Sequence, residues 1–267
     1  MSVRAAFRAY PALLRVGFAG AVAYRAEFLI WMFSTNMPLV MLAIWSSVAA
    51  EGAVGNYSQK GFTAYYLCAL LVRLLTGSWV VWELTMEIRQ GTLAMRLLRP
   101  LHPLIAYSAE NLAAVPLRGL ISVPLVVILL VSGGPSAVTS DPRLWLMFLP
   151  AMFGAWLLTF LVMAMIGTLS LYFESAASLF NAWLGLSAVL SGYLVPLDLF
   201  PPGFGRVAAV LPFRFLLSYP VELMLGRVTP LEGLALLGAQ WSYVAVAFAG
   251  TLLVWRSGMK RFGAYGG

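Results

Sequence analysis

Few side chains in this sequence could carry acid–base, nucleophilic or metal chemistry. It has one histidine, His102, and one cysteine, Cys68, so it can form neither a His-Glu-x-x-His zinc site nor an intrachain disulfide. Neither lysine, Lys60 or Lys260, stands in the Gly-x-x-x-x-Gly-Lys pattern of a phosphate-binding loop. The serines and threonines of the apolar stretches have no histidine or lysine base near them. We therefore expect no catalytic residue, no metal site and no cofactor on this chain.

The closest candidate for paired carboxylates is Glu83 with Glu87, four residues apart and followed by Arg89. Residues at this spacing share one face of a helix, so the two could act together. They stand, however, where an apolar stretch gives way to charged residues. We interpret the pair as a solvated, salt-bridged helix end rather than as an acid and its base.

Arg73 is the clearest ionisable group inside an apolar stretch. It lies about eleven residues into the stretch 62–83, and at a helical rise of about 1.5 Å per residue it falls near the middle of a membrane. Groups at that depth are functional candidates. Asn36 lies at a similar depth in an earlier stretch, whereas Arg118 is nearer a membrane surface and can extend towards it. Arg73 and Asn36 could line a translocation path, or Arg73 could be a structural cation paired with a neighbouring helix.

The short charged stretch 86–103 is the most informative part of the chain. After Gly91 its leucines follow helical spacing, and Arg96 and Arg99 lie off that face. Pro100 and Pro103 then end the helix. We expect a short amphipathic helix at the membrane surface, which either presses against a partner or orients on lipid headgroups. The leucines are Leu93, Leu97, Leu98 and Leu101.

Composition determines the class of protein. The 267 residues are 61% hydrophobic and 10% charged, whereas a soluble domain is about half apolar and about a quarter charged. A soluble enzyme and a disordered chain are both excluded, and an all-α polytopic membrane protein fits. Crossing a bilayer takes about 20 apolar residues. Six stretches within a single transmembrane domain, 1–267, meet this length: 28–50, 62–83, 112–131, 144–171, 176–197 and 231–255.

The net charge of +7 indicates how the chain is oriented. Lysine and arginine are enriched in cytoplasmic segments, and with six spans both termini lie on one side. The cations do not form one basic face, so we expect no nucleic-acid partner. We predict a multi-pass protein in the lipid bilayer of a bacterial-type plasma membrane, with both termini cytoplasmic. The cytoplasmic cations are then Arg4, Arg8, Arg15, Arg25, Arg89, Arg96, Arg99, Arg256, Lys260 and Arg261.

Two further segments are apolar without forming spans. In residues 1–25, Phe7, Tyr10 and Leu14 line one side of a helix beside a stripe of arginines, which is typical of a helix lying in the membrane interface. The alternative is a simple positively charged anchor. Residues 195–230 are divided by prolines and glycines into pieces of about 8–12 residues, too short to cross. We predict short re-entrant or interfacial helices there, on the outer face.

Two motifs resemble the permease subunits of ABC-2 type ABC transporters, within the branch of ABC-type transport system permease components. The first is Glu-x-Arg-x-Gly-x-Leu-x-x-x-Leu-Leu-Arg-Pro-Leu over residues 87–101. The second is Val-Pro-Leu-Asp-Leu-Phe-Pro over residues 195–201, followed by Leu-Pro-Phe at 211–213 and by Gly226. The resemblance extends over essentially the whole chain, including the number of predicted spans.

This resemblance implies a half-transporter that has no ATPase of its own. Two permease chains, a homodimer or a paralogous heterodimer, pair around a central path. Each rests on a separate ABC ATPase subunit, which binds the ATP and Mg. The expected cargo is amphiphilic: a lipid, a peptide or a drug-like molecule for export. The residues implied in coupling to the ATPase are Glu87, Arg89, Gln90, Gly91, Arg96, Arg99 and His102.

Two functions from other classes remain as alternatives. A standalone secondary carrier often has inverted repeats and helices broken at the membrane midplane, whereas the broken segment expected here follows the fifth span. An intramembrane lipid-modifying enzyme needs acid, base or metal ligands that converge at one depth, and the sequence offers no such set.

Overall fold

The computed structural model describes residues 3–23, 37–133, 137–173 and 176–262, which form an all-α structure without a strand in these ranges. Three short 3-10 turns, η2 (Leu169–Leu171), η3 (Leu197–Leu199) and η4 (Pro212–Leu216), accompany the α-helices. The helices are α1 (Val3–Ala23), α3 (Met37–Val48), α4 (Gln59–Thr76), α5 (Val80–Arg89), α6 (Leu93–Leu97), α7 (Pro103–Ala113), α8 (Val115–Gly133), α9 (Pro142–Thr168), α10 (Ala176–Leu190), α11 (Pro202–Val210), α12 (Ser218–Met224) and α13 (Pro230–Met259).

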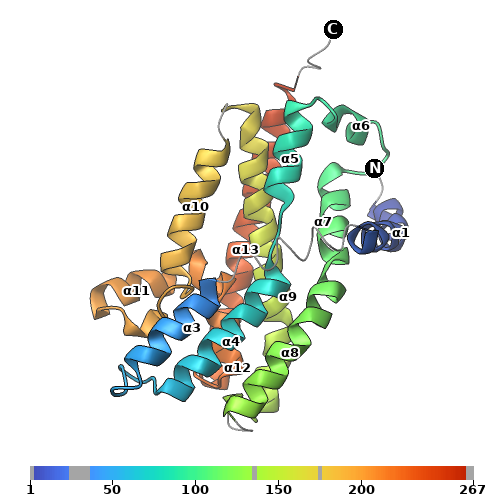
Figure 1. Cartoon of the computed structure of the whole chain (residues 1–267). Helices are drawn as coiled ribbons and strands as arrows, with labels where there is room; N and C mark the ends of the chain where they lie inside the picture. The colour runs from blue at the N-terminus through green and yellow to red at the C-terminus, as the bar shows by residue number, and fades with distance from the viewer. Residues whose placement is uncertain (1–2, 24–36, 134–136, 174–175, 263–267) are drawn as a thin grey trace.

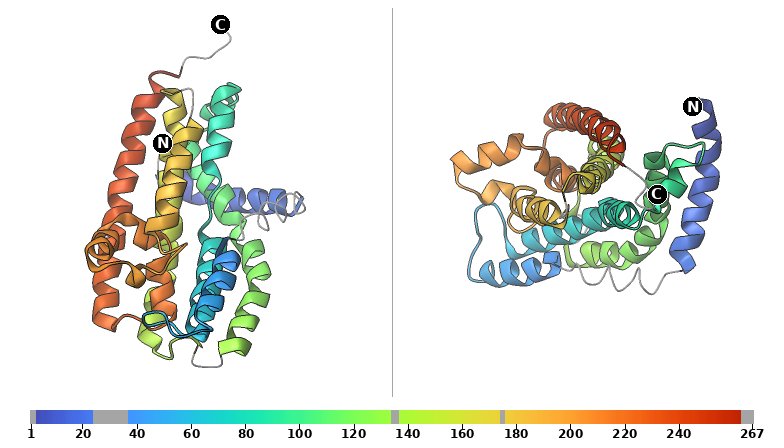
Figure 2. Two further views of the ribbon diagram at one scale, coloured as in Figure 1. Left: turned by 60° about the vertical axis from the view of Figure 1, so that its left-hand side comes forward. Right: turned by 90° about the horizontal axis from the view of Figure 1, so that it is seen from above.

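The long helices form one bundle, in which α13 packs on α9 and α4 packs on α8 (Figures 1 and 2). Within the described ranges, four helical stretches are long and apolar enough to cross a membrane: Gln59–Arg89, Pro103–Leu129, Pro142–Leu171 and Pro230–Met259. The shorter apolar helices α3 and α10 fall in the predicted spans 28–50 and 176–197. These findings confirm an all-α membrane protein. Asn36 and the rest of 24–36 lie outside the described residues.

Helix α9 is packed on α13 through a small residue and a buried amide. A Cβ atom added to Gly154 of α9 would lie 2.8 Å from the Gln240 side chain of α13, so only glycine leaves room for it. Gln240 is fully buried and its Nε2 donates to the carbonyls of Ala151 and Phe215, at 2.9 and 3.1 Å. Small residues and hydrogen bonds between helices are what hold helices together in lipid.

The predicted second span, 62–83, is not one continuous helix. Helix α4 ends at Thr76 and α5 begins at Val80, with Gly77 as the C-cap of the first. Arg118 of α8, only 5% exposed, donates a guanidinium hydrogen bond to the Gly77 carbonyl. The predicted span is confirmed as part of the apolar stretch Gln59–Arg89, with an interruption near mid-bundle that the sequence analysis did not predict. The expectation for Arg118 was wrong, because it is buried rather than extended to a membrane surface. The guanidinium supplies the Gly77 carbonyl with the hydrogen bond that a backbone amide would supply in an unbroken helix.

The predicted third span, 112–131, begins earlier than expected. Pro103 does not end a helix but occupies the first turn of α7, where its missing N–H costs nothing. The chain then continues through Ala114 into α8. The crossing formed by α7 and α8 therefore also changes direction, at the level of the break between α4 and α5 (Figure 1).

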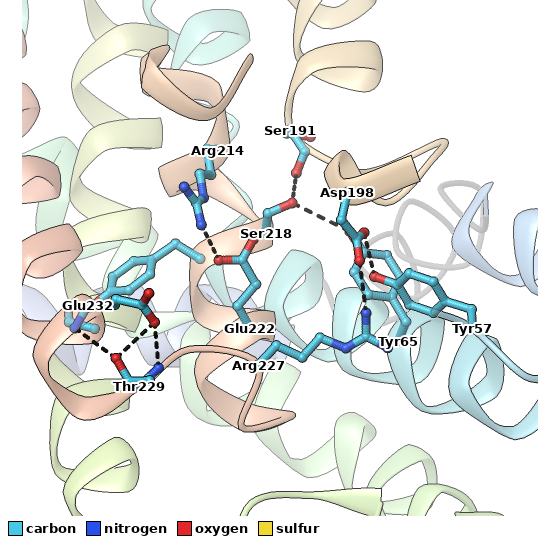
Figure 3. A network of polar contacts seen from close by, with 12 residues as sticks. Tyr57, Tyr65, Ser191, Asp198, Arg214, Ser218, Glu222, Arg227, Thr229 and Glu232 are labelled. Atoms are coloured by element: carbon cyan, nitrogen blue, oxygen red, sulfur yellow. Dashed lines mark hydrogen bonds and ion pairs between the residues drawn. The ribbon is translucent and has the colours of Figure 1, made fainter. Parts of the chain in front are cut away.

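Residues 195–230 fold into the short pieces η3, α11, η4 and α12, in the half of the bundle away from α6 (Figure 1). Polar contacts hold this segment against α4 and the loop before it (Figure 3). The Tyr57 hydroxyl donates to Asp198 at 2.8 Å, and the Arg227 guanidinium lies 3.7 Å from the centre of the Tyr57 ring. The buried Tyr65 hydroxyl donates to the carbonyl of Gly192 at 2.8 Å.

Helix α1 lies across the bundle helices and packs on α7 (Figure 2). It covers most of the predicted N-terminal helix 1–25. The two helices approach closely at Gly17, where an added Cβ would lie 2.9 Å from the Ala113 Cβ and 3.1 Å from the Glu110 Cα. The Tyr10 hydroxyl lies 3.3 Å from the Ser108 hydroxyl.

We predict that Gly17→Leu separates α1 from α7 and destabilises the chain by about 1–3 kcal/mol, the usual cost of overpacking. Gly20→Leu is the matched control, because an added Cβ there meets nothing within 4 Å. Thermal unfolding in detergent and the rate of proteolysis within α1 measure the two effects. Equal melting temperatures and equal cleavage rates in the two variants would contradict this packing.

We also predict that Arg118→Gln lowers the stability of the purified chain by about 1–3 kcal/mol, the cost of leaving a buried polar group unpaired. Hydrogen exchange of the amides at 77–80 should rise with it. Arg143→Gln is the control, since the Arg143 side chain is 70% exposed and pairs only at the surface with Asp141. If both variants melt at the temperature of the unmodified chain, Arg118 does not support the break.

Candidate functional site

The charged stretch 86–103 forms a compact junction of the ends of α5, α6 and α7, which we call the α6 junction. Gly91 has a φ of +73°, a left-handed conformation that favours glycine, and turns the chain from α5 into α6. Helix α6 has five residues, fewer than the helix that the leucine spacing predicts between Gly91 and Pro100. Of those leucines, Leu93 is fully buried while Leu98 is 80% exposed. A helix this short cannot place all four on one buried face.

Arg96 is the centre of the α6 junction. Its Nε lies 2.8 Å from Glu87 Oε1 of α5, and its Nη1 lies 2.8 Å from Glu110 Oε1 of α7. The guanidinium also lies 4.2 Å from the centre of the Tyr107 ring, and the Tyr107 hydroxyl donates to Glu87 Oε2 at 2.6 Å. One side chain therefore joins three helices through charge-assisted hydrogen bonds, which are the strong ones.

The electrostatics of Arg96 favour a permanent cation. Burial by itself lowers the pKa of the guanidinium, but the hydrogen bonds and charge of Glu110, together with Glu87, raise that pKa above its ordinary value. The Arg96 side chain is 18% exposed, so this is a partly buried ion pair. Removing Arg96 would leave the carboxylates of Glu87 and Glu110 facing one another across the junction.

The opposite side of the α6 junction consists of exposed side chains. Arg89, Gln90 and Arg99 are exposed, as are two large apolar side chains of the same surface, Met95 and Leu98. We call these five residues the α6 surface. Three of the residues expected to couple to a partner thus point outwards, while Glu87 and Arg96 pair inwards and Gly91 forms the turn.

His102, the last residue of that predicted set, begins α7. Its Nδ1 accepts a hydrogen bond from the Leu104 amide at 3.3 Å, and its ring lies 5.4 Å from that of Trp255 near the end of α13. Burial, and secondarily the charge of Arg256, lowers the pKa of the imidazole. The ring is therefore neutral at pH 7, as its accepting Nδ1 requires.

Helix α7 connects the α6 junction to α1. The residue that binds Arg96, Glu110, has its backbone under Gly17 of α1. The N-terminal helix and α6 are therefore both attached to α7. Sequence reasoning did not single out Glu110 or Tyr107, because both lie in α7 at a distance from the motif, and only the (i, i+3) spacing of the two relates them.

Arg73 lies in the last turn of α4, next to the break. Its guanidinium carbon is 6.0 Å from the centre of the Tyr193 ring, and none of the ion pairs among the described residues includes it. Its predicted partner Asn36 lies outside the described ranges, so the path and structural interpretations of Arg73 both stay predictions.

A shallow groove runs between α5 and the start of α10. Its walls are apolar, and the Trp82 and Phe180 rings meet edge to face at 5.1 Å. The Thr85 hydroxyl is buried there without a hydrogen-bond partner among the described residues, and Arg89 lines one part of it. Two helices far apart in sequence form the groove, so no local sequence pattern predicts it. The lining residues are Val81, Trp82, Thr85, Met86, Arg89, Ala176, Ala177 and Phe180.

Within the described ranges, no three His, Cys, Asp or Glu side chains cluster in a way that could hold a metal ion. No curated protein matches the chain. The family model described as ABC-2 family transporter protein matches residues 30–266, which include the α6 junction, the groove and the segment 195–230. The chain therefore belongs to the ABC-2 family of transporter proteins, the membrane-embedded permeases of ABC transport systems.

Proposed function

We propose that this chain is the permease subunit of an ATP-driven exporter and that the α6 surface docks on a separate ABC ATPase subunit. The observation that carries the proposal is the two-sided character of α6. Arg96 anchors the helix to α5 and α7, while Met95, Leu98 and Arg99 are presented outwards. Leu98, 80% exposed between Arg96 and Arg99, is an apolar side chain that a docked partner would bury.

ATP and Mg bind to the partner in this proposal. The chain has no phosphate-binding loop, so the free energy for transport comes from another subunit. We propose that Arg89, Gln90 and Arg99 contact the ATPase directly and that Glu87, Gly91, Arg96 and His102 shape the junction beneath them. The chain itself is not an enzyme.

The membrane placement follows from the same assignment. Helix α13 ends at the α6 end of the bundle, and the segment 195–230 lies in the other half (Figure 1). We propose that the α6 end faces the cytoplasm together with both termini, and that the segment 195–230 faces outwards. Helices α3 and α10, with 12 and 15 residues, are the cores of the two remaining spans. Two such chains, identical or paralogous, enclose the central path.

The groove between α5 and α10 supports an amphiphilic cargo. Its walls of Trp82, Met86 and Phe180 suit the alkyl or aromatic group of such a cargo. The groove lies on α5, the same helix that Arg96 ties to α6. Arg73 is a further candidate for lining the translocation path.

Docking is tested with Leu98→Asp in the full chain. Fully burying a leucine contributes about 1.5–3 kcal/mol, and a buried aspartate opposes binding further. We expect at least a tenfold loss of the ABC ATPase subunit that co-purifies with the chain, and the same loss of ATP hydrolysis by the preparation. Leu231→Asp is the control, because Leu231 is equally exposed, at 79%, but begins α13 at the other end. Equal ATPase recovery in both variants would exclude the α6 surface as the docking site.

The cargo assignment is tested with Trp82→Ala in the assembled transporter. Loss of the apolar wall should weaken the stimulation of ATP hydrolysis by amphiphiles severalfold, because about 1–2 kcal/mol of apolar contact disappears. Phe204→Ala on α11 is the matched control, with Phe204 43% exposed and Trp82 42% exposed. A panel of a lysophospholipid, an acylated peptide and a cationic amphiphile identifies the class. If Trp82→Ala leaves the stimulation of ATP hydrolysis unchanged at every concentration of all three amphiphiles, the groove is not part of the cargo path.

A further inference from the structure

We propose that Arg73, with the ring of Tyr193 beside it, binds the anionic head group of an amphiphile at the middle of the membrane. The ligand class is a molecule that joins an apolar chain to a phosphate or carboxylate head. That this molecule is the cargo of an exporter rests on the proposed function. The binding site itself depends only on side chains of this chain.

Arg73 is a cation at the depth where charge is most costly. It lies at the centre of the apolar stretch Gln59–Arg89, in the last turn of α4. Its guanidinium carbon is 6.0 Å from the centre of the Tyr193 ring, and no ion pair among the described residues includes it. An aromatic face stabilises a cation less than a carboxylate does. Arg73 therefore has the charge, the depth and the geometry to accept an anion from a ligand.

A second guanidinium increases the positive potential at this place. Arg118 is buried on α8, donates to the Gly77 carbonyl one turn after Arg73, and repels Arg73 electrostatically. Glu83 offsets part of this repulsion by attracting Arg118. The Ser78 hydroxyl, in the break between α4 and α5, is buried without a hydrogen-bond partner among the described residues. A bound anion would offset the charge of Arg73 as Glu83 offsets that of Arg118.

Tyr193 stands on a segment that is already ordered. It lies between α10 and η3, where the backbone carbonyls on both sides of it accept hydrogen bonds from buried hydroxyl groups (Figure 3). A side chain fixed in this way loses little conformational entropy when a ligand binds beside it. The hydroxyl donors and their carbonyl acceptors, each 2.8 Å apart, are Tyr65 with Gly192, Tyr66 with Leu194 and Ser218 with Ser191.

One face of α4 carries both a bond to this segment and the cation. Tyr66 and Arg73 are seven residues apart, a spacing that places them on the same side of a helix. Tyr66 bonds the carbonyl of Leu194, the residue after Tyr193, so Arg73 is directed at the same segment. The side chains of Arg73 and Tyr193 are both half-buried, which leaves each of them accessible to a ligand.

The site lies along the same two helices as the groove. Trp82 of α5 and Phe180 of α10 line the groove. Helix α5 begins just after the break that follows Arg73, and α10 ends at Leu190, shortly before Tyr193. At the rise of a helix, the part of α10 between Phe180 and Leu190 is about 15 Å long. An amphiphile whose head group is bound at Arg73 can therefore extend its apolar chain along α10 towards the groove.

The site is tested first by binding to the isolated full chain in a neutral detergent. The probes are lysophosphatidic acid, lysophosphatidylcholine with the same acyl chain, and inorganic phosphate alone. We expect lysophosphatidic acid to bind at least tenfold more tightly than lysophosphatidylcholine, and inorganic phosphate to bind at least a hundredfold more weakly than lysophosphatidic acid. Equal affinities for the two lysophospholipids overturn the proposal. Phosphate that binds as tightly as lysophosphatidic acid overturns the assignment to an amphiphile.

Arg73→Gln should remove the preference for lysophosphatidic acid, and Arg73→Lys, which keeps the charge, should retain part of it. Arg143→Gln is the matched control, because it lowers the net charge equally at a side chain that is 70% exposed. We expect it to keep the whole preference. An unchanged preference in Arg73→Gln overturns the proposal. So does an equal loss in Arg73→Gln and Arg143→Gln, which would show a general attraction of anions to a basic chain.

A photolabel locates the site without any variant, so the test does not depend on how Arg73→Gln folds. Lysophosphatidic acid with a diazirine on its glycerol should label peptides that contain Arg73 or Tyr193 in the unmodified chain. An excess of unlabelled lysophosphatidic acid should suppress this labelling at least tenfold more effectively than lysophosphatidylcholine does. Labelling confined to other peptides overturns the proposal.

The assembled transporter then separates this site from the proposed function. Lysophosphatidic acid should stimulate ATP hydrolysis at a concentration at least tenfold lower than lysophosphatidylcholine requires. If both act at the same concentration, the anionic class of cargo is wrong while the exporter stands. If the chain binds no ATPase, the proposed function fails, and binding to the isolated chain still decides whether Arg73 holds an anionic head group.

Discussion

A helix that crosses a bilayer has to satisfy its own backbone hydrogen bonds, because the hydrocarbon core supplies no substitutes. This chain departs from that constraint at Gly77, in the middle of the apolar stretch Gln59–Arg89, where α4 ends before α5 begins. The Gly77 carbonyl, which has no partner within its own helix, accepts a hydrogen bond from the buried guanidinium of Arg118 on a neighbouring crossing. Because that neighbour changes direction at Ala114, between α7 and α8, the contact joins the break to a bend in the next crossing (Figure 1). The division of the bundle into two halves depends on it.

Both halves of the bundle contain ion pairs, but different helices are joined by them. Away from α6, the ion pairs Arg214–Glu222 and Arg227–Asp198 are accompanied by neutral hydrogen bonds of buried hydroxyl groups; the Ser218 hydroxyl, for example, donates to the Ser191 carbonyl just after α10 at 2.8 Å (Figure 3). Such bonds are well protected in apolar surroundings. At the α6 end the ties are ion pairs of partly exposed groups around Arg96. Pairs of this kind depend on the charge of every member, so a substitution of Arg96 leaves Glu87 and Glu110 without their shared cation.

Much of the architecture follows from the order of apolar and charged residues. The predicted spans 144–171 and 231–255 coincide closely with α9 and α13, because long uninterrupted apolar runs admit little else. The interruption at 77–79 and the start of α7 at Pro103 were not predicted, for local reasons. A single glycine in a long apolar run is compatible with a continuous helix, and a proline after a charged stretch can either end a helix or begin the next one. The helix predicted for α6 was too long, because the leucine spacing continues past the residue at which the backbone leaves the helix.

By itself, the sequence determined the class of protein, the absence of a phosphate-binding loop and the location of a charged motif between two spans, since these depend on composition and on spacing along the chain. Only the tertiary structure decided what the motif's residues do. Arg96 and Arg99 are three positions apart and look alike in the sequence, yet one lies between Glu87 and Glu110 and the other is exposed. Glu110 comes from a helix that the motif does not contain, and a guanidinium takes its role from the carboxylates that packing brings within 3 Å of it.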